Sequence, residues 1–171
     1  MIDELRQLTR QSGDAAHAAD QLMALYDFAC TRQNGVFVEL GTDRGVATKI
    51  LLAASEKVNG NVISIDIRDC HSILNHNRWT FIQSDSADIT QIEKLLGDDL
   101  TRVDLVYSDS LHTPQHVASE INAWTPKLAP GGRMYFDDVD SGPYQQGARK
   151  DNYRMEAANR EILRVVENYF R

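Results

Sequence analysis

The 171-residue sequence has few of the features that mark secreted, membrane-spanning or nucleic-acid-binding proteins. Its two cysteines, Cys30 and Cys70, lack the spacing of a metal-binding motif and are too few for a disulfide framework, which favours a reducing cytoplasm. No segment reaches the roughly 18 apolar residues of a membrane span. The polar start, MIDELRQLTR, does not resemble a signal peptide.

Positive charge is also in short supply, since 25 acidic residues face 18 basic ones and the formal net charge is −7. An acidic protein is a poor match for nucleic-acid backbones and anionic membranes, because both attract positive charge. What remains is the composition of an ordinary globular protein, with 42% hydrophobic and 25% charged residues. No repeat or linker interrupts the chain, so residues 1–171 are predicted to form a single domain.

Short apolar runs alternate with helical patterns along the chain. Such runs, rich in β-branched and aromatic residues, predict strands at residues 36–40, 61–66, 79–83, 103–109 and within APGGRMYFDD (129–138). Apolar side chains at helical spacing predict helices at residues 14–33, 46–57, 87–97, from Pro114 onward, and 152–170. Segments 1–13 and 139–151 are expected to be loops. The alternation predicts an α/β fold with a doubly wound, mainly parallel sheet.

Acidic side chains recur where these strands end. In a doubly wound sheet the carboxyl ends of the parallel strands meet at one edge, and ligands bind there. Six carboxylates at one edge are more than solubility requires, so we expect a functional site at that edge. They belong to Glu39, Asp66, Asp85, Asp109, Asp137 and Asp138.

The turn after the first strand, ELGTDRGVAT, contains Gly41 and Gly45 in a G-x-x-x-G spacing. This spacing differs from the dinucleotide-binding G-x-G-x-x-G, and the turn lacks the Lys-Ser/Thr pair of a phosphate-binding loop. Glu39 would repel a pyrophosphate, so a cationic ligand fits this turn better. Asp66 ends the second predicted strand and is placed to accept hydrogen bonds from ribose hydroxyls, while SDSAD (84–88) offers polar groups to an adenine edge.

Five segments, taken in order, resemble the successive motifs of class I S-adenosylmethionine-dependent methyltransferases. They are VFVELGTDRG, VISIDI, FIQSDSAD, VDLVYSDSLH and LAPGGRMYFDDV. The pair formed by SDSLH and FDDV is closest to small-molecule O-methyltransferases that use a divalent metal, such as the catechol-type, macrolide-sugar and rhamnosyl enzymes. The resemblance therefore implies methyl transfer from S-adenosylmethionine, with Mg²⁺, to a small hydroxylated acceptor.

The resemblance also implies roles for individual residues. The glycine-rich turn would hold the methionine part of the cofactor and Asp66 the ribose, and His112 would remove the proton of the acceptor beside Asp109. His116, one turn further, is a second polar candidate for the pocket. The cofactor contacts implied are Glu39, Gly41, Thr42, Gly45, Asp66, Ile67, Asp85, Ser86 and Asp109, and the metal ligands are Asp109, Asp137 and Asp138.

Plainer interpretations of these residues stay open. An aspartate at a strand end often caps the following helix, and His112 precedes Thr113-Pro114, a typical helix start. Two alternative functions follow: a methyltransferase that needs no metal, and a protein that binds S-adenosylmethionine without transferring its methyl group, as a truncated or regulatory module would.

The chain departs from the family pattern at its C-terminal end. Class I methyltransferases continue into an antiparallel strand pair, whereas this sequence ends at Arg171, directly after its last predicted helix. We therefore expect a sheet of about five strands, whether the sequence is truncated or naturally short. A bare fifth strand would be an exposed edge, so a second copy in a homodimer, or segment 139–151, is expected to cover it.

Overall fold

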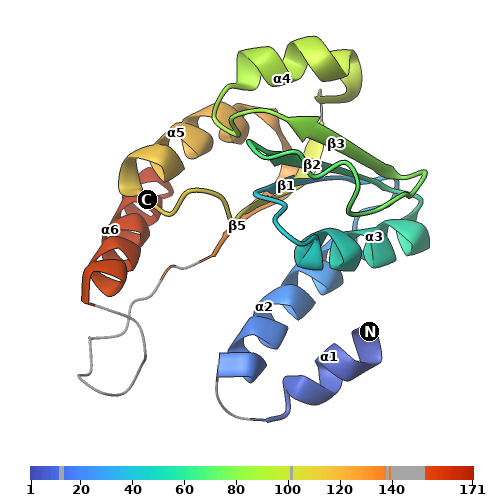
Figure 1. Cartoon of the computed structure of the whole chain (residues 1–171), viewed down its shortest axis with the longest axis horizontal. Coiled ribbons are helices and arrows are strands. Elements are labelled where there is room, and N and C mark those ends of the chain that lie inside the picture. The colour runs from blue at the N-terminus through green and yellow to red at the C-terminus, as the bar shows by residue number, and fades with distance from the viewer. Residues whose placement is uncertain (12–13, 101, 138, 140–152) are drawn as a thin grey trace.

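The computed structural model describes residues 1–11, 14–100, 102–137, 139 and 153–171. Within them, five strands form one sheet in the order β3-β2-β1-β4-β5, and every neighbouring pair is parallel (Figure 1). The doubly wound α/β fold predicted from the sequence is confirmed. The strands are β1 (Val36–Leu40), β2 (Asn61–Asp66), β3 (Trp79–Gln83), β4 (Val103–Ser108) and β5 (Leu128–Phe136).

Helices cover both faces of this sheet. In Figure 1, α2 and α3 lie below the sheet and α4 and α5 above it, while α6 lies beside α5. Every helix within the described residues is too short or too polar to cross a membrane. The helices are α1 (Ile2–Leu8), α2 (Asp14–Ala29), α3 (Val46–Val58), α4 (Ile89–Leu96), α5 (Pro114–Trp124) and α6 (Tyr153–Tyr169), with short 3₁₀ turns at Gly97–Leu100 and Thr125–Lys127.

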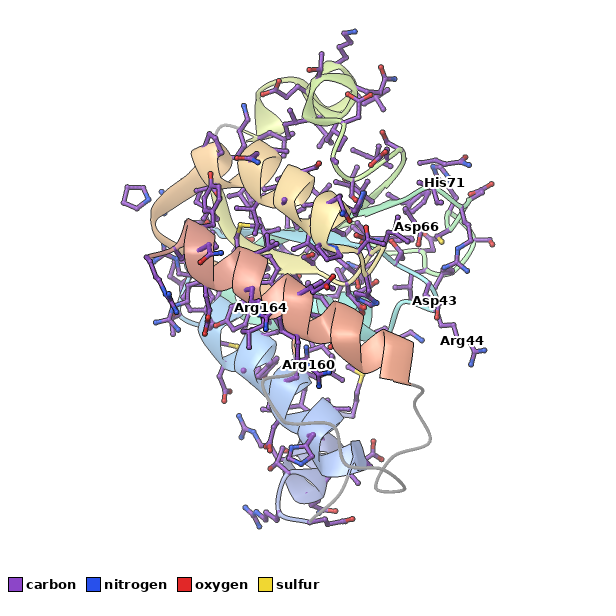
Figure 2. The ribbon with its side chains drawn as sticks, turned by 90° about the vertical axis from the view of Figure 1, so that its left-hand side faces the viewer. Asp43, Arg44, Asp66, His71, Arg160 and Arg164 are labelled. Carbon is purple, nitrogen blue, oxygen red and sulfur yellow. The ribbon has the colours of Figure 1, made fainter. Side chains whose placement is uncertain are left out.

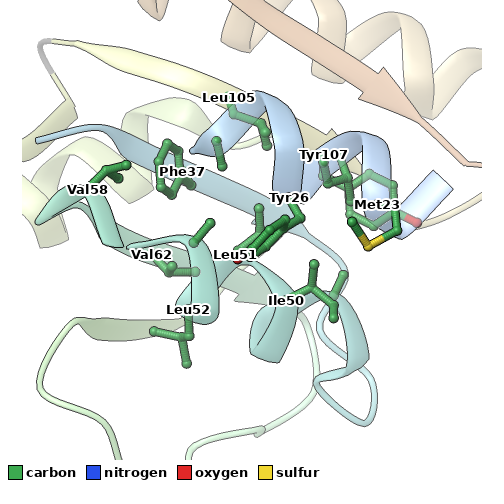
Figure 3. Close-up of a cluster of buried hydrophobic side chains, with 14 residues drawn as sticks. Met23, Tyr26, Phe37, Ile50, Leu51, Leu52, Val58, Val62, Leu105 and Tyr107 are labelled. Carbon is green, nitrogen blue, oxygen red and sulfur yellow. The ribbon is translucent and has the colours of Figure 1, made fainter. Parts of the chain in front are cut away.

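Side-chain alternation along the strands creates a separate hydrophobic core on each face. On the α2–α3 face, Phe37 of β1 packs with Tyr26 and Leu51 (Figure 3). On the opposite face, the neighbouring Val38 packs in a cluster that contains Trp124 of α5. Because both faces are buried, the strands are apolar almost throughout, and polar side chains concentrate at their ends.

Two helices, α1 and α2, differ from the sequence prediction by more than two residues. Residues 2–8, expected to be a loop, form helix α1, whose Ile2 and Leu5 pack against the α2–α3 core. Helix α2 ends at Ala29 rather than near residue 33. Turns follow it, and Asn34 then takes a left-handed conformation with φ of 54°.

The strand order reverses between β1 and β4, which lie side by side at the centre of the sheet. From β1 the sheet extends outward to β2 and β3, and from β4 it extends in the opposite direction to β5. Connections therefore diverge at the carboxyl ends of β1 and β4 and leave a crevice between them. Gly41 follows the first of these strands and Asp109 follows the second.

Candidate active site at the carboxyl edge of the sheet

Gly41 brings two loops into direct contact at this crevice. Its φ of 93° lies in the left-handed region, and a Cβ at this position would stand 2.0 Å from the carbonyl oxygen of Asp109. Its amide donates to the carbonyl of Ile65 in β2, at 2.8 Å, while the amide of Asp109 donates to the carbonyl of Leu40, also at 2.8 Å. Glycine is therefore required here because the backbone after β4 occupies the place of a side chain.

Asp66 lies beside this turn and is tied to it. Its Oδ2 accepts hydrogen bonds from the amides of Thr42 and Asp43, at 3.0 and 3.2 Å. Its Oδ1 accepts from the amide of Arg68 at 2.9 Å. Burial alone would raise the pKa of Asp66, but these backbone donors and the Arg68 guanidinium outweigh it and lower the pKa. The carboxylate is therefore negatively charged, and Figure 2 shows it on the same side of the molecule as Asp43.

A cavity of about 320 Å³ opens next to these groups. Six of the predicted cofactor residues line it: Gly41, Asp66, Ile67, Asp85, Ser86 and Asp109. Other lining residues come from the same strand ends and from the start of α5, among them Asp43, Arg68, Ser110, Leu111 and His116. The carboxyl ends of β1, β2, β3 and β4 all contribute, so the structure brings these predicted residues together around one space.

Three other predicted cofactor residues do not line the cavity. Glu39 is buried within the sheet, and its Oε2 accepts from the hydroxyls of Thr48 and Ser64, both at 2.6 Å. Burial raises its pKa to about 7, although these two hydroxyls act in the opposite direction. Thr42 is buried in the turn after β1, and Gly45 caps the start of α3 with a φ of 70°. Glu39, Thr42 and Gly45 therefore belong to the framework around the turn after β1 and not to the lining of the cavity.

The second predicted cluster is formed by Asp109, His112 and Asp137. One ligand atom from each lies within 4.8 Å of the others. His112 Nε2 is 3.4 Å from Asp109 Oδ1, and the hydroxyl of Tyr107 donates to Asp109 Oδ2 at 3.3 Å. The amide of Asp137 donates to the carbonyl of Ser108, which places the end of β5 beside the end of β4. Asp138, the third predicted metal ligand, lies outside the described residues.

Negative charge accumulates around Asp109. Burial raises the pKa of Asp109, as does the neighbouring Asp137, and the hydrogen bond from His112 opposes them. Burial is the main reason why the pKa of the Tyr107 hydroxyl is raised, and the charges of Asp109 and Asp137 raise it further. The hydroxyl therefore stays protonated and able to donate. Asp137 has a fixed orientation, since Gln21 of α2 donates its amide Nε2 to Asp137 Oδ1 at 2.6 Å. The arrangement would be stabilised by a bound cation.

Glu120, which is hydrogen-bonded to the cavity-lining residues Ser86 and Ser110, is a component of the site that the sequence analysis missed. It lies in α5 and is fully buried, and its carboxylate accepts from Ser86, Ser108 and Ser110 at 2.5, 2.6 and 2.5 Å. His116 Nε2 is 3.2 Å from Glu120 Oε1. An acidic residue inside an apolar helical face is the only signal of it in the sequence.

The family assignment agrees with this geometry. A family model described as a methyltransferase domain matches residues 38–139, which run from within β1 past the end of β5 and include every site residue described above except Gln21. The chain belongs to this methyltransferase family. The match covers more than half of the chain and confirms the resemblance read from its motifs. No curated protein sequence matches the chain significantly.

Solved structures of methyltransferases share the fold. MycE from the mycinamycin biosynthetic pathway, in complex with Mg, SAH and mycinamycin VI, is 19% identical over 79% of this chain and 39% of that chain, with a TM-score of 0.59. CalS11, a TDP-rhamnose 3′-O-methyltransferase, is 16% identical over 81% and 77% of the two chains, with a TM-score of 0.57.

A putative caffeoyl-CoA O-methyltransferase from Staphylococcus aureus is 14% identical over 99% of this methyltransferase domain and 82% of that chain, with a TM-score of 0.63. Identities this low establish the fold alone. The domain also spans only 39% of the MycE chain.

Proposed function

We propose that this domain binds S-adenosylmethionine in the cavity at the carboxyl edge of the sheet and transfers its methyl group to a hydroxyl of a small molecule, assisted by Mg²⁺. The observation that carries the proposal is the position of Asp109. It lines the cavity and also belongs to the cluster with His112 and Asp137. A methyl donor in the cavity and an acceptor at the cluster would therefore meet at one residue.

The cavity fits the cofactor in size and charge. Its volume of about 320 Å³ is within the range of small-molecule sites, which starts at about 300 Å³. Asp66 offers a charged acceptor for ribose hydroxyls, and Asp85 offers one for the amino group of adenine. The two carboxylates with Asp109 give the site a negative potential, which suits the positively charged sulfonium and ammonium groups of S-adenosylmethionine.

The Asp109–His112–Asp137 cluster fits a hard divalent cation. Mg²⁺ prefers oxygen ligands, and one or two carboxylates with several waters are a usual set. Asp109 and Asp137 would hold the ion, and Gln21 would keep the Asp137 carboxylate oriented through its 2.6 Å hydrogen bond. Bound there, Mg²⁺ would lower the pKa of an acceptor hydroxyl and orient its oxygen.

His112 is the proposed base. In the transfer, the acceptor oxygen forms a bond to the methyl carbon as the carbon–sulfur bond breaks, and the bonding electrons stay on sulfur. The proton of the hydroxyl passes to the imidazole of His112. Asp109, 3.4 Å from His112 Nε2, stabilises the positive charge that this proton creates. The closeness of the two side chains supports this division of roles.

Isothermal titration with S-adenosylhomocysteine tests the cofactor assignment. We expect a measurable binding heat with micromolar affinity, and Asp66→Asn should weaken binding because it removes the negative charge that receives the ribose. Asp27→Asn, at an aspartate with 65% of its side chain exposed, is the matched control. Absence of heat at millimolar ligand would overturn the assignment.

Metal binding is tested with Mn²⁺ as a paramagnetic substitute for Mg²⁺. Titration followed by electron paramagnetic resonance should show one site, and Asp109→Asn should abolish it while Asp27→Asn should not. Methyl transfer is then measured as the formation of S-adenosylhomocysteine from S-adenosylmethionine in the presence of catechol, sugar and polyketide acceptors. Full activity in EDTA would indicate a metal-independent enzyme, and cofactor binding without any release would indicate a binding module.

A further inference from the structure

The Glu120 carboxylate collects hydrogen bonds from four side chains that come from three separate parts of the fold. Ser86 follows β3, Ser108 ends β4, Ser110 follows β4, and His116 lies one helical turn before Glu120 in α5. Each lies between 2.5 and 3.2 Å from a carboxylate oxygen. Burying a charge without hydrogen-bond partners would be costly, so these four donors compensate for the full burial of the Glu120 carboxylate.

This carboxylate is held in its ionised form. Burial would raise the pKa of Glu120, but the hydrogen bonds from His116 and from the three serines together lower it. The hydrogen bond to Glu120 raises the pKa of His116, which favours the protonated imidazole next to the ionised carboxylate. An ionised carboxylate can only accept hydrogen bonds, so each serine must direct its hydroxyl hydrogen toward Glu120.

The direction of those hydrogens sets the polarity of the cavity wall. Ser86 and Ser110 both line the cavity, next to Asp85. A hydroxyl whose hydrogen is already donated has only lone pairs to offer to another group. Ser86 is also fixed in place, because Trp124 donates its indole N–H to the Ser86 carbonyl at 2.8 Å. The side chains of Asp85, Ser86 and Ser110 therefore present hydrogen-bond acceptors to a ligand, and Nε2 of His116, which also lines the cavity, lies 3.2 Å from Glu120 Oε1.

We propose that Glu120 determines which purine base the cavity accepts, by holding the hydroxyl hydrogens of Ser86 and Ser110 away from the ligand. This inference rests on the proposed binding of S-adenosylmethionine. A wall of acceptors suits the exocyclic amino group of adenine, which donates, and disfavours the ring carbonyl of a 6-oxopurine, which only accepts. Glu120 does not touch the ligand in this account. It is a positioning residue whose effect reaches the base through the two serines.

The test compares two ligands that differ at the 6-position of the base and at the adjacent N1, which carries a hydrogen only in the 6-oxo base. Titration calorimetry gives the dissociation constants of S-adenosylhomocysteine and S-inosylhomocysteine, its 6-oxo analogue. The wild-type protein should prefer the amino base at least tenfold. Glu120→Gln should reduce that preference several-fold, because the glutamine amide can donate to a serine oxygen and so free its hydroxyl hydrogen to face the ligand. Glu161→Gln, at an exposed glutamate of α6, should keep the full preference.

The ratio of the two affinities separates specificity from support of the fold. If Glu120→Gln weakens both ligands equally and leaves the ratio unchanged, Glu120 is only structural and the inference is wrong. If that variant does not fold, Ser86→Ala and Ser110→Ala decide instead, and an unchanged ratio in both refutes the inference. Equal wild-type affinities for the two ligands also refute it. Absence of wild-type binding to S-adenosylhomocysteine counts against the proposed function itself.

Discussion

Gly41 is the residue at which the geometry of the site is least tolerant of change. The Gly41→Ala variant would place a methyl group 2.0 Å from the Asp109 carbonyl oxygen, with an unfavourable φ of 93°. The loops after β1 and β4 must then separate. We expect the free energy of unfolding to fall by about 3 kcal/mol or more. Urea denaturation measures that loss, and calorimetry with S-adenosylhomocysteine measures the loss of affinity.

Gly131→Ala is the matched control for that variant. Gly131 also has a positive φ, of 74°, but an added Cβ would have its nearest contact 3.5 Å away, at the Arg32 guanidinium. Only the left-handed backbone penalty of about 1–2 kcal/mol applies. Equal losses in the two variants would show that backbone conformation, and not the approach of Asp109, explains the requirement for glycine at position 41.

Glu39 should make the stability of the ligand-free protein depend on pH. Burial raises its pKa from an ordinary 4.5 to about 7, so the folded protein keeps a proton that the unfolded chain has already lost. Between these pH values the folded state binds more protons, and the free energy of unfolding therefore decreases as pH rises. The Glu39 contribution to this decrease should reach about 3 kcal/mol at most.

The Glu39→Gln variant tests this linkage. A neutral amide can still accept from Thr48 and Ser64 but carries no titratable proton. The variant should lose the Glu39 part of the pH dependence and be more stable than the wild type at pH 8. Urea unfolding at pH 5 and pH 8 gives the comparison. Parallel pH profiles for both proteins would contradict the raised pKa.

How far single residues could be predicted depended on whether their neighbours were visible in the sequence. Asp66 ends β2, Asp109 directly follows β4 and Asp85 lies two residues after β3, and a parallel sheet brings such positions to one edge. Glu120 gave no comparable signal. Its donors Ser86 and Ser108 belong to other parts of the fold, since Ser86 follows β3 and Ser108 ends β4. Helical spacing alone marks position 120 as buried without saying what a carboxylate does there.

At the scale of elements, α6 packs against α5 through a hydrophobic cluster that contains Ile162. Ile162 is fully buried among Val117 and Ile121, with Val165 and Val166 packed around them. The Ile162→Ala variant should lower the free energy of unfolding by about 2–4 kcal/mol, because it leaves a cavity between the helices. Leu95→Ala in α4, where the leucine is 56% exposed, should change it by less than about 0.5 kcal/mol. Urea denaturation measures both, and a similar small change in both variants would show that α6 is only loosely attached.

Elements with a strong local pattern were predicted with nearly correct bounds. Strands β1, β2 and β3 match their predicted ranges because each is a compact apolar run between turn residues. Helix α1 was missed because its seven residues are too few to form a stable helix alone. It forms through contacts of Ile2 and Leu5 with the α2–α3 core, and such tertiary contacts are invisible in a local pattern.

At the scale of the whole molecule, the alternation of strands and helices was enough to predict the topology. Right-handed crossovers leave few other ways to build a parallel sheet from these elements. The state of the sheet edges could not be predicted, since it depends on surfaces and not on periodicity. Among the described residues, β5 pairs with β4 alone and so has one open side.

The open side of β5 is the reason to expect a second copy. Unpaired backbone groups on an edge strand are a liability that proteins usually cover. Exposed aromatic side chains lie beside it: Phe170, 51% exposed, has its ring 6.4 Å from that of Phe136 at the end of β5, and the adjacent Tyr169 is 42% exposed. An edge and an aromatic patch in one place suit burial in a self-complementary interface.

We therefore expect a homodimer that uses this end of the molecule. Light scattering should give twice the 19.3 kDa of one chain, and Phe170→Asp should shift the mass toward a single chain, because a buried charge in the interface is unfavourable. Leu95→Asp places the same charge on an exposed leucine of α4 and should leave the dimer intact. A wild-type mass of one chain at all concentrations would contradict the dimer, and a dimer unaffected by Phe170→Asp would contradict this interface.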